Sequence, residues 1–545
     1  MQEIPSQWDL VVDVAVVGSG AAALAAAVSA AVAGAKVVLV ERSDKFGGTT
    51  AVSGGVAWVP NNPHMADVGA TDSREDALTY LRRLSLDRTE DRLLEAFVDH
   101  GPEAVRFLEA QTPLRFVALR YPDYHPEFPG GKRGGRSLDP ALLDSHQLGS
   151  LAQAVRPSPH VPGPISIADT EAGIDLLDFT VIAERLKQGL LAGGNALVAA
   201  LLKGCADHGV ELRREARARQ LHVQRGAVVG LAVEQGGRLV QIGARRGVVL
   251  ASGGFEWNAG LCREFLRGPL EAAASPPFNE GDGLTMAMEV GAALGNMSEA
   301  WWMPLCRIPG EEYGGRDMYR ITLKERTLPG SLIVNRAGQR FVNEAHNYND
   351  IGRAFHSFDP VAFDFPNVPA WLVFDHGYKS RYPLITMFPE DPIPPWLPQA
   401  PSLRALAESQ GIDPDGLEAA VRRFNDGAAR GEDPDFHRGR SVYDHYNGDS
   451  SRDGALRTLG ALTTPPFYAL RMYAGTLGTK GGPRTNERAQ VLHVRGEVIP
   501  GLYAAGNVMA GITGLAYGGA GGTIGPALTF GYIAGSTAAR DASRF

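Results

Sequence analysis

The fold of this chain follows from one stretch, VVDVAVVGSGAAALAAAVSAAVAGAKVVLVERSDKFGGTTAVSGG, residues 11–55. Residues 13–17 are mainly apolar and β-branched, which is typical of a short strand buried on both faces of a sheet. A glycine turn ends this strand, and the alanine-rich residues 21–33 predict a helix. Residues 36–40 predict a second strand. This order of elements is typical of the first unit of a dinucleotide-binding fold.

The glycine turn and the end of the second strand predict how a dinucleotide is held. Gly18 allows the tight turn, and Gly20 lets the backbone approach a pyrophosphate at the N-terminus of the helix. Glu41 follows about 20 residues later, where a carboxylate accepts hydrogen bonds from ribose hydroxyls and favours a free 2′-hydroxyl over a 2′-phosphate. We expect this unit to bind the dinucleotide through Gly18, Gly20, Ala21, Ala22, Glu41 and Arg42.

A long apolar N-terminal region can also be a signal peptide or a membrane span. Asp13 interrupts the first strand, Lys36 and the glycine turn interrupt the apolar run, and no basic region comes before it. We therefore expect neither a signal peptide nor a transmembrane segment. The expected location is the cytoplasm, with peripheral contact to a membrane surface left open.

The composition narrows the class of protein. At 545 residues the chain exceeds what one hydrophobic core usually supports, so two domains are expected. The net charge of −8, with no basic stripe, argues against a nucleic-acid partner. The three cysteines, Cys205, Cys262 and Cys306, lie far apart and match neither a zinc spacing nor a disulfide framework, so no metal site is expected.

The distribution of glycine predicts how the domains are connected. The 66 glycines gather in the N-terminal unit and again in residues 475–535. We predict an α/β fold with a Rossmann-like dinucleotide-binding domain built from both termini, residues 1–299 and 476–545. Residues 300–475 would form an inserted α+β substrate domain.

Three local patterns complete the predicted architecture. Helical spacing predicts helices within residues 72–108, capped by Thr71 or Asp72. Residues 332–335 and 340–343 predict two strands around a turn. Trp301, Trp302 and Met303 would form either core packing or the wall of an apolar substrate pocket.

A second loop, dense in small residues and hydroxyl groups, follows Glu41: Gly47, Gly48, Thr49, Thr50, Ser53, Gly54 and Gly55. Here the sequence resembles the large flavoprotein family that includes the fumarate reductases and the 3-ketosteroid dehydrogenases. The resemblance implies FAD as cofactor, with this loop over the pyrophosphate. Some relatives attach FAD covalently through a histidine in this loop, and the matching position here is Gly48. The resemblance therefore implies non-covalent FAD.

Three later segments resemble the rest of the family's FAD site. RGVVLASGG, residues 246–254, matches the return of the chain to the main sheet, and NEGDG, residues 279–283, matches a flavin-side turn. The last helix begins in residues 521–525, where its N–H dipoles would face the flavin. Residues 502–505 predict a further strand, from which the chain turns at residues 506–507. The FAD-binding residues expected in these segments and in this turn are Gly253, Gly254, Asp282, Gly506, Asn507, Gly522, Thr523 and Ile524.

Within that family, the chain most closely resembles the 3-ketosteroid Δ1-dehydrogenases, nearly from end to end. Their loop tyrosine matches Tyr124, and their base tyrosine, shortly after an Asn-Glu pair, matches Tyr348. The tyrosine and glycine of their last motif match Tyr517 and Gly521. One departure is YGGAG at residues 517–521, where the family often has prolines, and it leaves the substrate range and the pocket shape in doubt.

The resemblance implies the roles of these four residues. The Tyr517 hydroxyl and the Gly521 N–H would hold the ketone oxygen, in the manner of an oxyanion hole. Tyr348 would take the C2 proton as a tyrosinate, with Tyr124 lowering its pKa or sharing the proton, while flavin N5 takes the hydride from C1. No nicotinamide site is evident, so an external acceptor such as a quinone would reoxidise the flavin.

Other functions stay open at this point. In fumarate reductases a histidine and an arginine grip the dicarboxylate, and these fall at Thr513 and Tyr517 here, so an apolar ketone fits better. Δ4 desaturation of a 5α-3-ketosteroid needs similar groups in another placement. A flavin electron carrier without catalysis would need neither the inserted domain nor the paired donors. The sequence leaves open which steroid or cyclic ketone is used, the physiological acceptor, the oligomeric state and any regulation.

Overall fold

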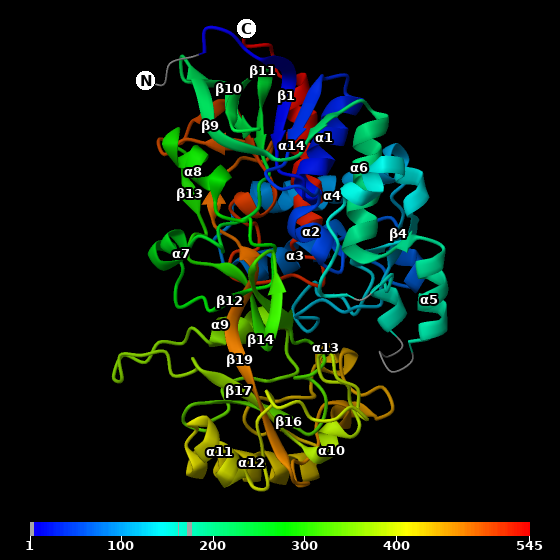
Figure 1. The fold of residues 1–545 in the computed structure, drawn as a ribbon, viewed down its shortest axis with the longest axis vertical. Helices are drawn as coiled ribbons and strands as arrows, with labels where there is room; N and C mark the ends of the chain where they lie inside the picture. The colour runs from blue at the N-terminus through cyan, green and yellow to red at the C-terminus, as the bar shows by residue number, and fades with distance from the viewer. Residues whose placement is uncertain (1–4, 162, 172–176) are drawn as a thin grey trace.

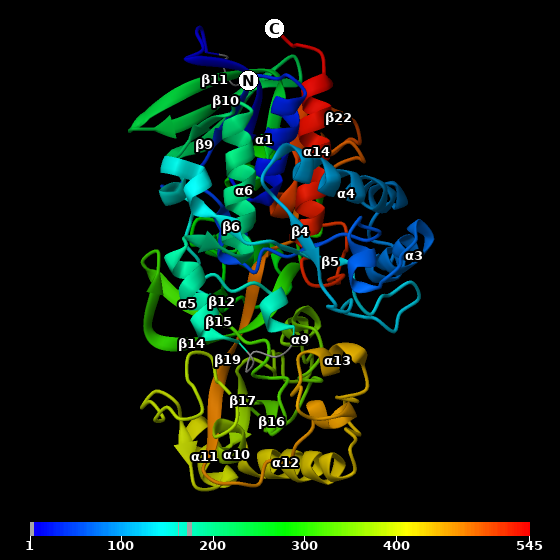
Figure 2. The same cartoon turned by 90° about the vertical axis from the view of Figure 1, so that its right-hand side faces the viewer.

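The computed structural model describes residues 5–161, 163–171 and 177–545. The molecule is elongated, and the C-terminus lies at the same end as β1 and the end of α14 (Figure 1). Two main sheets follow one another along its length, one near the C-terminus and one around β17 and β19 at the opposite end (Figures 1 and 2).

The sheet near the C-terminus holds the predicted dinucleotide-binding unit. Its strand order is β21-β22-β11-β1-β2-β8, with β10 and β9 extending from β11. The pairs β1–β2, β2–β8, β1–β11 and β11–β22 are parallel, whereas β21 pairs antiparallel with β22 and β10 pairs antiparallel with both β11 and β9. The strands are β1 (Leu10–Val17), β2 (Val37–Val40), β8 (Glu211–Arg213), β9 (Ala216–Gln224), β10 (Ala227–Gln235), β11 (Arg238–Leu250), β21 (Gln490–Leu492) and β22 (Val498–Ala504).

The alanine-rich helix packs closely because its residues are small. Helix α1 (Ala21–Val32) is almost wholly buried and packs against α14 (Ile524–Arg540) and α6 (Gly193–Asp207). A Cβ added to Gly531 would lie 2.4 Å from the Ala22 carbonyl oxygen, and one added to Gly535 would lie 2.1 Å from that of Ala26. Glycine in α14 therefore brings the last helix of the chain into backbone contact with the first.

The second sheet has the order β15-β14-β19-β17-β16, and the short strands β12 and β18 also pair with β19. Strand β17, which lies between β19 and β16, is buried on both faces, with Leu372 and Phe374 in one hydrophobic cluster and Trp371 and Val373 in another. Helices α11 and α12 cover the second of these faces. The elements are β14 (Ala300–Tyr313), β15 (Arg316–Ile321), β16 (Ser331–Asn335), α9 (Tyr348–Ala354), β17 (Ala370–Asp375), α10 (His376–Lys379), β18 (Gln399–Ala400), α11 (Leu403–Gln410), α12 (Pro414–Ala429), α13 (Val442–Tyr446) and β19 (Phe467–Thr479).

The remaining helices and strands lie outside the two main sheets or at β19. They are α2 (Gly48–Val52), β3 (Ala57–Trp58), α3 (Arg74–Ser85), α4 (Asp91–Gln111), β4 (Phe116–Ala118), β5 (Ser137–Pro140), β6 (Leu143–Asp144), α5 (Phe179–Lys187), β7 (Leu190–Leu191), α7 (Ala259–Phe265), β12 (Ala272–Ala273), α8 (Asp282–Glu289), β13 (Leu294–Gly295) and β20 (Gly482–Pro483).

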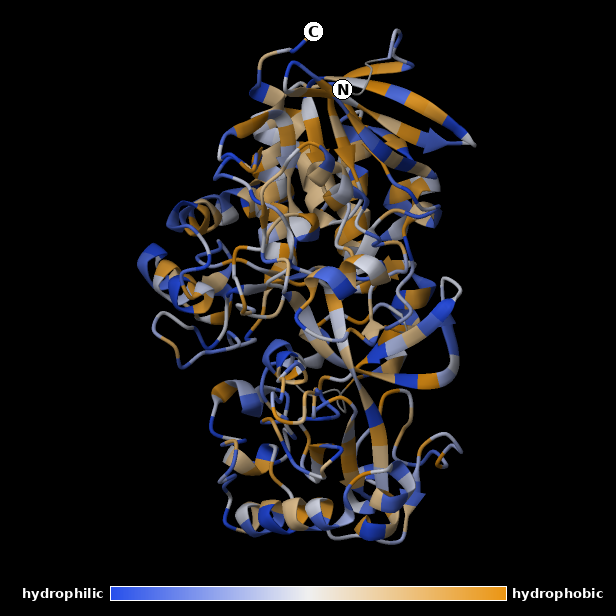
Figure 3. Ribbon diagram, turned by 90° about the vertical axis from the view of Figure 1, so that its left-hand side faces the viewer, coloured by the Kyte–Doolittle hydropathy of each residue, from blue (hydrophilic) through white to orange (hydrophobic). Residues whose placement is uncertain are grey.

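Hydrophobic residues gather on the strands and helices of the end that holds the C-terminus (Figure 3). The helices at the opposite end alternate between hydrophobic and hydrophilic residues, as expected for helices with one face on a sheet (Figure 3). None of the helices in the described parts of the chain combines the length and the apolar character needed to cross a bilayer.

The predicted α/β fold is confirmed, since strands from both ends of the chain share the first sheet. The proposed boundaries at residues 299/300 and 475/476 stay a prediction. Strand β14 begins at Ala300, whereas β19 continues to Thr479.

Two local predictions were wrong. Residues 340–343 form no strand: Arg340 makes one isolated bridge to Val334, and β16 pairs with β17 instead. The cap of α3 is Ser73, whose side chain accepts the Asp76 N–H, rather than Thr71 or Asp72. The Asp72 carboxylate instead accepts two hydrogen bonds from the Arg136 guanidinium, at 2.7 and 2.8 Å.

Candidate active site

The turn after β1 can only be built with glycine. Gly18 has φ +106°, a conformation that other residues rarely adopt, and a Cβ there would lie 2.3 Å from the Ala251 carbonyl oxygen. The Gly18 N–H donates to the Val40 carbonyl oxygen at 2.8 Å. The turn is therefore fixed by both neighbouring strands, β2 and β11.

Glu41 joins the two glycine-rich loops. Its buried carboxylate accepts hydrogen bonds from the Ser19 hydroxyl at 2.6 Å and from the Ser43 N–H and hydroxyl at 2.9 Å. The Ser19 hydroxyl also accepts the Gly47 N–H at 2.9 Å. Of the carboxylate's lone pairs, one on Oε2 is left for a further donor such as a ribose hydroxyl.

One cavity of about 490 Å³ contains most of the predicted site residues in its wall. All four predicted catalytic residues line it: Tyr124, Tyr348, Tyr517 and Gly521. The predicted cofactor-binding residues that line it are Gly18, Gly20, Ala21, Ala22, Glu41, Arg42, Gly48, Thr49, Thr50, Ser53, Gly54, Gly55, Gly253, Asp282, Gly506, Asn507, Thr523 and Ile524. The predicted dinucleotide site and the tyrosines therefore share one space.

Three predicted cofactor-binding glycines lie in the same loops but outside this wall. Gly47 has φ +118°, and a Cβ there would lie 2.6 Å from the Ala51 methyl group. A Cβ on Gly254 would lie 2.2 Å from the Thr479 hydroxyl, and one on Gly522 would lie 2.8 Å from the Tyr517 ring. These glycines shape the loops through contacts with protein atoms.

The polar groups along the cavity fit an anionic dinucleotide. Arg156 is buried, and among the described residues its guanidinium donates only to the hydroxyls of Tyr313 and Ser43, with Nε unpartnered. The buried Ser252 hydroxyl also has no partner in the described chain. An unneutralised cation and free donors beside the Gly18 turn suit a pyrophosphate. No motif in the sequence pointed to Arg156, which lies in a proline-rich segment.

Arg42 and Asp282, both predicted to bind the cofactor, also contact each other. The Arg42 guanidinium lies 3.4 Å from the Asp282 carboxylate and 2.9 Å from that of Glu280. Arg217 lies on the same two carboxylates, at 2.6 and 3.0 Å. This network joins the end of β2 to the start of α8 at one end of the cavity.

Three parts of the chain each contribute one tyrosine to the cavity. Tyr124 comes from the loop between β4 and β5, Tyr348 is the first residue of α9, and Tyr517 precedes α14. The ring centroid of Tyr124 lies 5.3 Å from that of Tyr348 and 5.1 Å from that of Tyr517, and the latter two lie 5.3 Å apart. All three side chains are buried.

Residues at the start of α9 contact the loops that carry Tyr124 and Tyr517. The Asp350 carboxylate lies 3.0 Å from the His125 ring, next to Tyr124 in the chain, and 3.2 Å from the His346 ring. The Asn349 side chain donates to the Leu515 carbonyl oxygen at 3.2 Å, in the loop of Tyr517. Although burial acts against it, hydrogen bonds from the two histidines hold the pKa of Asp350 well below its usual range.

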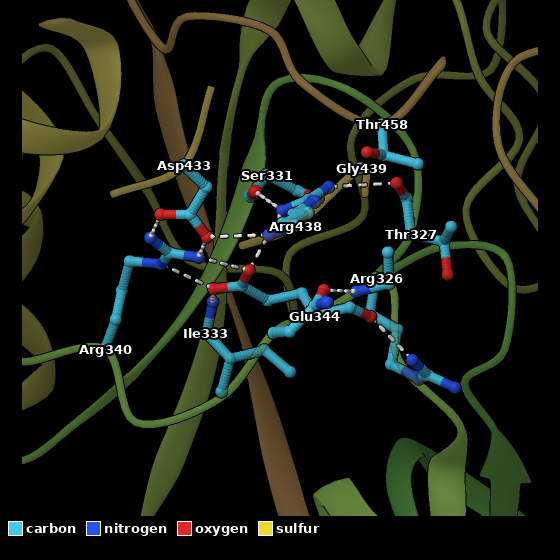
Figure 4. A network of polar contacts seen from close by, with 12 residues as sticks. Arg326, Thr327, Ser331, Ile333, Arg340, Glu344, Asp433, Arg438, Gly439 and Thr458 are labelled. Atoms are coloured by element: carbon cyan, nitrogen blue, oxygen red, sulfur yellow. Dashed lines mark hydrogen bonds and ion pairs between the residues drawn. The ribbon is translucent and has the colours of Figure 1, made fainter. Parts of the chain in front are cut away.

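A buried network of charges fixes the segment that leads to Tyr348 (Figure 4). The Glu344 carboxylate accepts from Arg340 at 2.8 Å and from Arg438 at 3.1 Å, and Arg340 also donates to Asp433 at 2.8 Å. Arg326 donates to the Glu344 and His346 carbonyl oxygens, at 2.5 and 2.7 Å. Removing one partner from such a buried network typically costs about 3–5 kcal/mol of stability, so the segment is held firmly.

Gly521 offers a free backbone donor beside the tyrosines. It has φ +93°, and a Cβ there would lie 2.4 Å from the Val56 carbonyl oxygen. Its carbonyl oxygen accepts the Trp58 N–H at 3.0 Å, whereas its own N–H has no acceptor within the described chain. Only glycine fits this position, and its N–H is available to a ligand.

Burial sets the protonation of the three phenols. It raises the pKa of Tyr348 and of Tyr124 well above the ordinary value, and it raises the pKa of Tyr517 as well. The negative charge of an ionised Tyr517 would raise the pKa of Tyr348 further, whereas the contact with the Tyr124 phenol lowers it. Tyr124 thus acts on Tyr348 in the expected direction, but burial dominates.

Trp301, Trp302 and Met303 divide between the two predicted roles, core packing and the wall of the pocket. Met303 lines the cavity. Trp302 belongs to a separate core cluster and packs on the His356 ring, with centroids 4.2 Å apart. The Trp301 ring contacts Tyr517, with centroids 4.8 Å apart, and its Nε1–H donates to Asn507 at 3.0 Å.

A family model described as FAD binding domain matches residues 13–524. The chain belongs to this FAD-binding family. FAD is therefore its cofactor, the predicted family is confirmed, and the protein is an FAD-dependent oxidoreductase.

Relatives within the family match nearly the whole chain. A 4-oxocyclohexanecarboxylate 2-dehydrogenase from Sinomonas cyclohexanicum is 40% identical, over 98% of this chain and 94% of the relative. A 3-oxosteroid 1-dehydrogenase from Mycobacterium tuberculosis is 38% identical, over 96% of this chain and 97% of the relative.

A solved structure matches equally completely. The 3-ketosteroid delta1-dehydrogenase from Sterolibacterium denitrificans, in complex with 1,4-androstadiene-3,17-dione, is 36% identical with a TM-score of 0.91. The match covers 97% of this chain and 99% of that one. A flavocytochrome c3 fumarate reductase shares only the fold, at 23% identity and a TM-score of 0.67.

Proposed function

We propose that the protein is an FAD-dependent dehydrogenase that introduces a C1–C2 double bond into a 3-ketosteroid. The observation that carries the proposal is the meeting of Tyr124, Tyr348 and Tyr517 in the wall of the cavity formed by the dinucleotide cradle. FAD, when bound, supplies the acceptor for the hydride that leaves C1. The likeness to 3-oxosteroid 1-dehydrogenases over almost the entire chain supports the same substrate class.

Neutral donors would activate the ketone. The Tyr517 hydroxyl and the unpartnered Gly521 N–H would donate hydrogen bonds to the ketone oxygen and stabilise the enolate that forms when C2 loses a proton. Tyr348, with its ring 5.3 Å from both other phenols, would take that proton. Tyr124 would lower the cost of ionising Tyr348 by donating to its oxygen.

The rest of the wall suits an apolar substrate. Its apolar side chains include Val161, Ile167, Met303, Ile321, Leu323, Ile385 and Leu477. Arg320 also lines the cavity, but its guanidinium makes two hydrogen bonds to Glu311, at 2.7 and 2.8 Å. Thr513 directs its hydroxyl to the Ala516 carbonyl oxygen. These contacts support a ketone over the dicarboxylate of a fumarate reductase.

A monocyclic oxo-carboxylate is the second candidate substrate. It is favoured by the 40% identity to a 4-oxocyclohexanecarboxylate 2-dehydrogenase, slightly above that to the steroid enzymes. The enolisation chemistry would be the same, with the smaller ring held by the same phenols. The two candidates differ in the apolar area that they bury, which favours the steroid in this cavity.

One experiment distinguishes these substrates. The holoenzyme would be mixed anaerobically with androst-4-ene-3,17-dione, with a 5α-3-ketosteroid or with 4-oxocyclohexanecarboxylate, while flavin absorbance and products are followed. We expect the steroid to bleach the flavin and to yield the 1,4-diene. Bleaching by the monocyclic acid alone would show that the substrate is a monocyclic oxo-carboxylate and not a steroid. Conversion of a 5α-steroid to a 4-ene would show Δ4 in place of Δ1 desaturation. If no ketone bleaches the flavin, the proposed function is wrong.

We further propose the arrangement around this reaction. The FAD would be non-covalent, because Gly48 offers no side chain for attachment, and acid precipitation should then release all flavin to the supernatant. Residues 1–299 with 476–545 would form the FAD-binding domain and residues 300–475 the substrate domain. An external acceptor such as a quinone would reoxidise the enzyme in the cytoplasm.

A further inference from the structure

Lys480 is a buried cation outside the machinery described so far. It follows β19 directly and is 0% exposed. Its Nζ donates to the carbonyl oxygens of Gly514, at 3.3 Å, and Ala516, at 2.5 Å. Its Nζ also lies 4.1 Å from the centroid of the Trp301 ring. Within the described residues no carboxylate lies within ion-pair distance of its Nζ. The contacts of the Lys480 side chain are therefore with backbone carbonyl oxygens and the face of an aromatic ring.

Both of those carbonyls belong to the loop that carries Tyr517. The Lys480 backbone holds the same loop, since its carbonyl oxygen accepts the Gly511 N–H at 2.9 Å. The Lys480 N–H donates to the Glu299 carbonyl oxygen at 3.0 Å, which fixes Lys480 where β19 ends beside the start of β14. Lys480 therefore ties the Tyr517 loop to β14 and β19 at three points.

A second route to the same phenol runs through Trp301. The Lys480 ammonium lies over the Trp301 ring, and the edge-to-face contact between Trp301 and Tyr517 has a centroid distance of 4.8 Å. Below about pH 7, where Lys480 keeps its proton, a buried cation over an indole contributes more than an exposed one, because no water competes for it. Lys480 thus supports Tyr517 through the backbone before it and through the ring beside it.

We propose that Lys480 is a positioning residue that holds the Tyr517 phenol in the orientation needed to donate to the ketone oxygen. This inference rests on the proposed function, in which Tyr517 is that donor. Lys480 itself does not line the cavity and acts through Tyr517. A displacement of the phenol by about 1 Å would cost on the order of 10²-fold in rate.

The charge of Lys480 gives a readout that does not depend on activity. Burial lowers the pKa of Lys480 to about 7, against the opposing effect of the Glu299 and Asp350 carboxylates, while Arg353 adds to the lowering. In the unfolded chain the lysine binds its proton up to about pH 10. Between these values the unfolded state binds more protons, so folding stability rises with pH by up to about tenfold in the folded-to-unfolded ratio per unit.

The matched control is Lys379, the other lysine that is buried and bonded to backbone carbonyls in the described chain. Its Nζ donates to Phe388, Pro389 and Asp391, at 2.9, 3.1 and 3.2 Å, in the second sheet's end of the molecule. Substitution Lys379→Met removes the same type of side chain without touching the Tyr517 loop. It should leave kcat within about threefold of the wild type.

The test compares Lys480→Met with this control and with Tyr517→Phe in a double-mutant cycle. We expect Lys480→Met to lower kcat by about 10- to 100-fold with FAD content unchanged, and to cost less than about threefold in the Tyr517→Phe background. The variant should also lose the rise of stability between about pH 7 and pH 10. If Lys480→Met fails to fold, Lys480→Gln, which keeps one donor, takes its place.

Two results would overturn the inference: an equal loss of kcat in both backgrounds, or an unchanged kcat. Failure of the proposed function is separate, because it shows as a wild-type holoenzyme that oxidises no ketone. In that case the same double-mutant cycle is measured on the free energy of unfolding, and it tests whether Lys480 positions Tyr517. Coupling between the two substitutions then supports contact through the loop and Trp301, and additivity refutes it.

Discussion

In the proposed mechanism, Tyr348 accepts a proton although burial disfavours its charged form. Its replacement by phenylalanine removes the base and leaves the ring packing, so turnover should fall by about 10²- to 10⁴-fold while FAD stays bound. Steady-state assays with a dye acceptor measure the turnover, and the flavin spectrum measures the bound FAD.

Tyr443→Phe is the control for that substitution. Tyr443 is equally buried in the same cluster, with its ring 5.1 Å from that of Tyr124, but its hydroxyl has no partner in the described chain and does not line the cavity. It should keep most of the activity. Similar losses in both variants would mean that packing, and not proton transfer, explains the result.

The raised pKa of Tyr348 predicts an alkaline rise in rate. Because the folded pKa lies above about 10, the fraction of tyrosinate grows up to about tenfold per pH unit throughout the accessible range, and kcat/KM should grow with it. Since Tyr124 lowers the pKa of Tyr348, Tyr124→Phe should move this rise to higher pH. A profile that is flat from about pH 7 to 10 would count against Tyr348 as the base.

Arg156 should contribute to FAD affinity through its charge. A hydrogen bond from a buried cation to an anion contributes about 1.5–3 kcal/mol, so Arg156→Met should raise the Kd of the apoprotein for FAD by about 10- to 100-fold. Fluorescence titration with FAD measures this directly. Arg214→Met is the control, because Arg214 is exposed and its guanidinium contacts the Asp44 carbonyl oxygen and the Phe46 ring. Equal weakening in both variants would contradict a specific role.

At the scale of elements, the turn between β1 and α1 is predicted to hold the cofactor. Gly18→Ala would place a methyl group 2.3 Å from the Ala251 carbonyl oxygen, so the turn must open and FAD binding should be lost. Gly34→Ala is the matched control, because Gly34 also has a positive φ, +86°, but has nothing within 4 Å of the added atom. It should cost only about 1 kcal/mol of stability and retain FAD. Flavin content after purification decides between these outcomes.

The same elements show where sequence patterns suffice. The first strand, glycine turn and helix were predicted correctly because period, turn chemistry and helix composition are all local. Residues 340–343 were predicted wrongly as a strand because the turn at Ala337 and Gly338 was interpreted as the turn of a hairpin. There Arg340 is held instead by the carboxylates of Glu344 and Asp433, and Asp433 is 93 residues away, a contact that no local pattern contains.

At the scale of the whole molecule, the site is assembled from distant parts of the chain. The family resemblance identified Tyr124, Tyr348 and Tyr517, but only the fold brings their rings within about 5 Å of one another, because they come from the β4–β5 loop, the start of α9 and the loop before α14. Arg156 and Lys480 were not predicted, since an isolated buried cation has no sequence signature. The roles proposed for them follow from their burial and from the lack of a carboxylate partner within the described chain.

Because the cavity is lined by both ends of the molecule, a ketone ligand should stabilise only the complete site. Androsta-1,4-diene-3,17-dione at about 100 times its Kd should stabilise the holoenzyme by about 2.7 kcal/mol. That corresponds to a rise in Tm of a few degrees, about 2–4 °C per kcal/mol at most for a chain of this size. The apoprotein should show no comparable rise, because the cradle that lines the same cavity is then empty. Thermal unfolding of both forms, with cholesterol as an apolar control lacking the ketone, measures the difference, and equal stabilisation of apoprotein and holoenzyme would place the steroid outside the cavity.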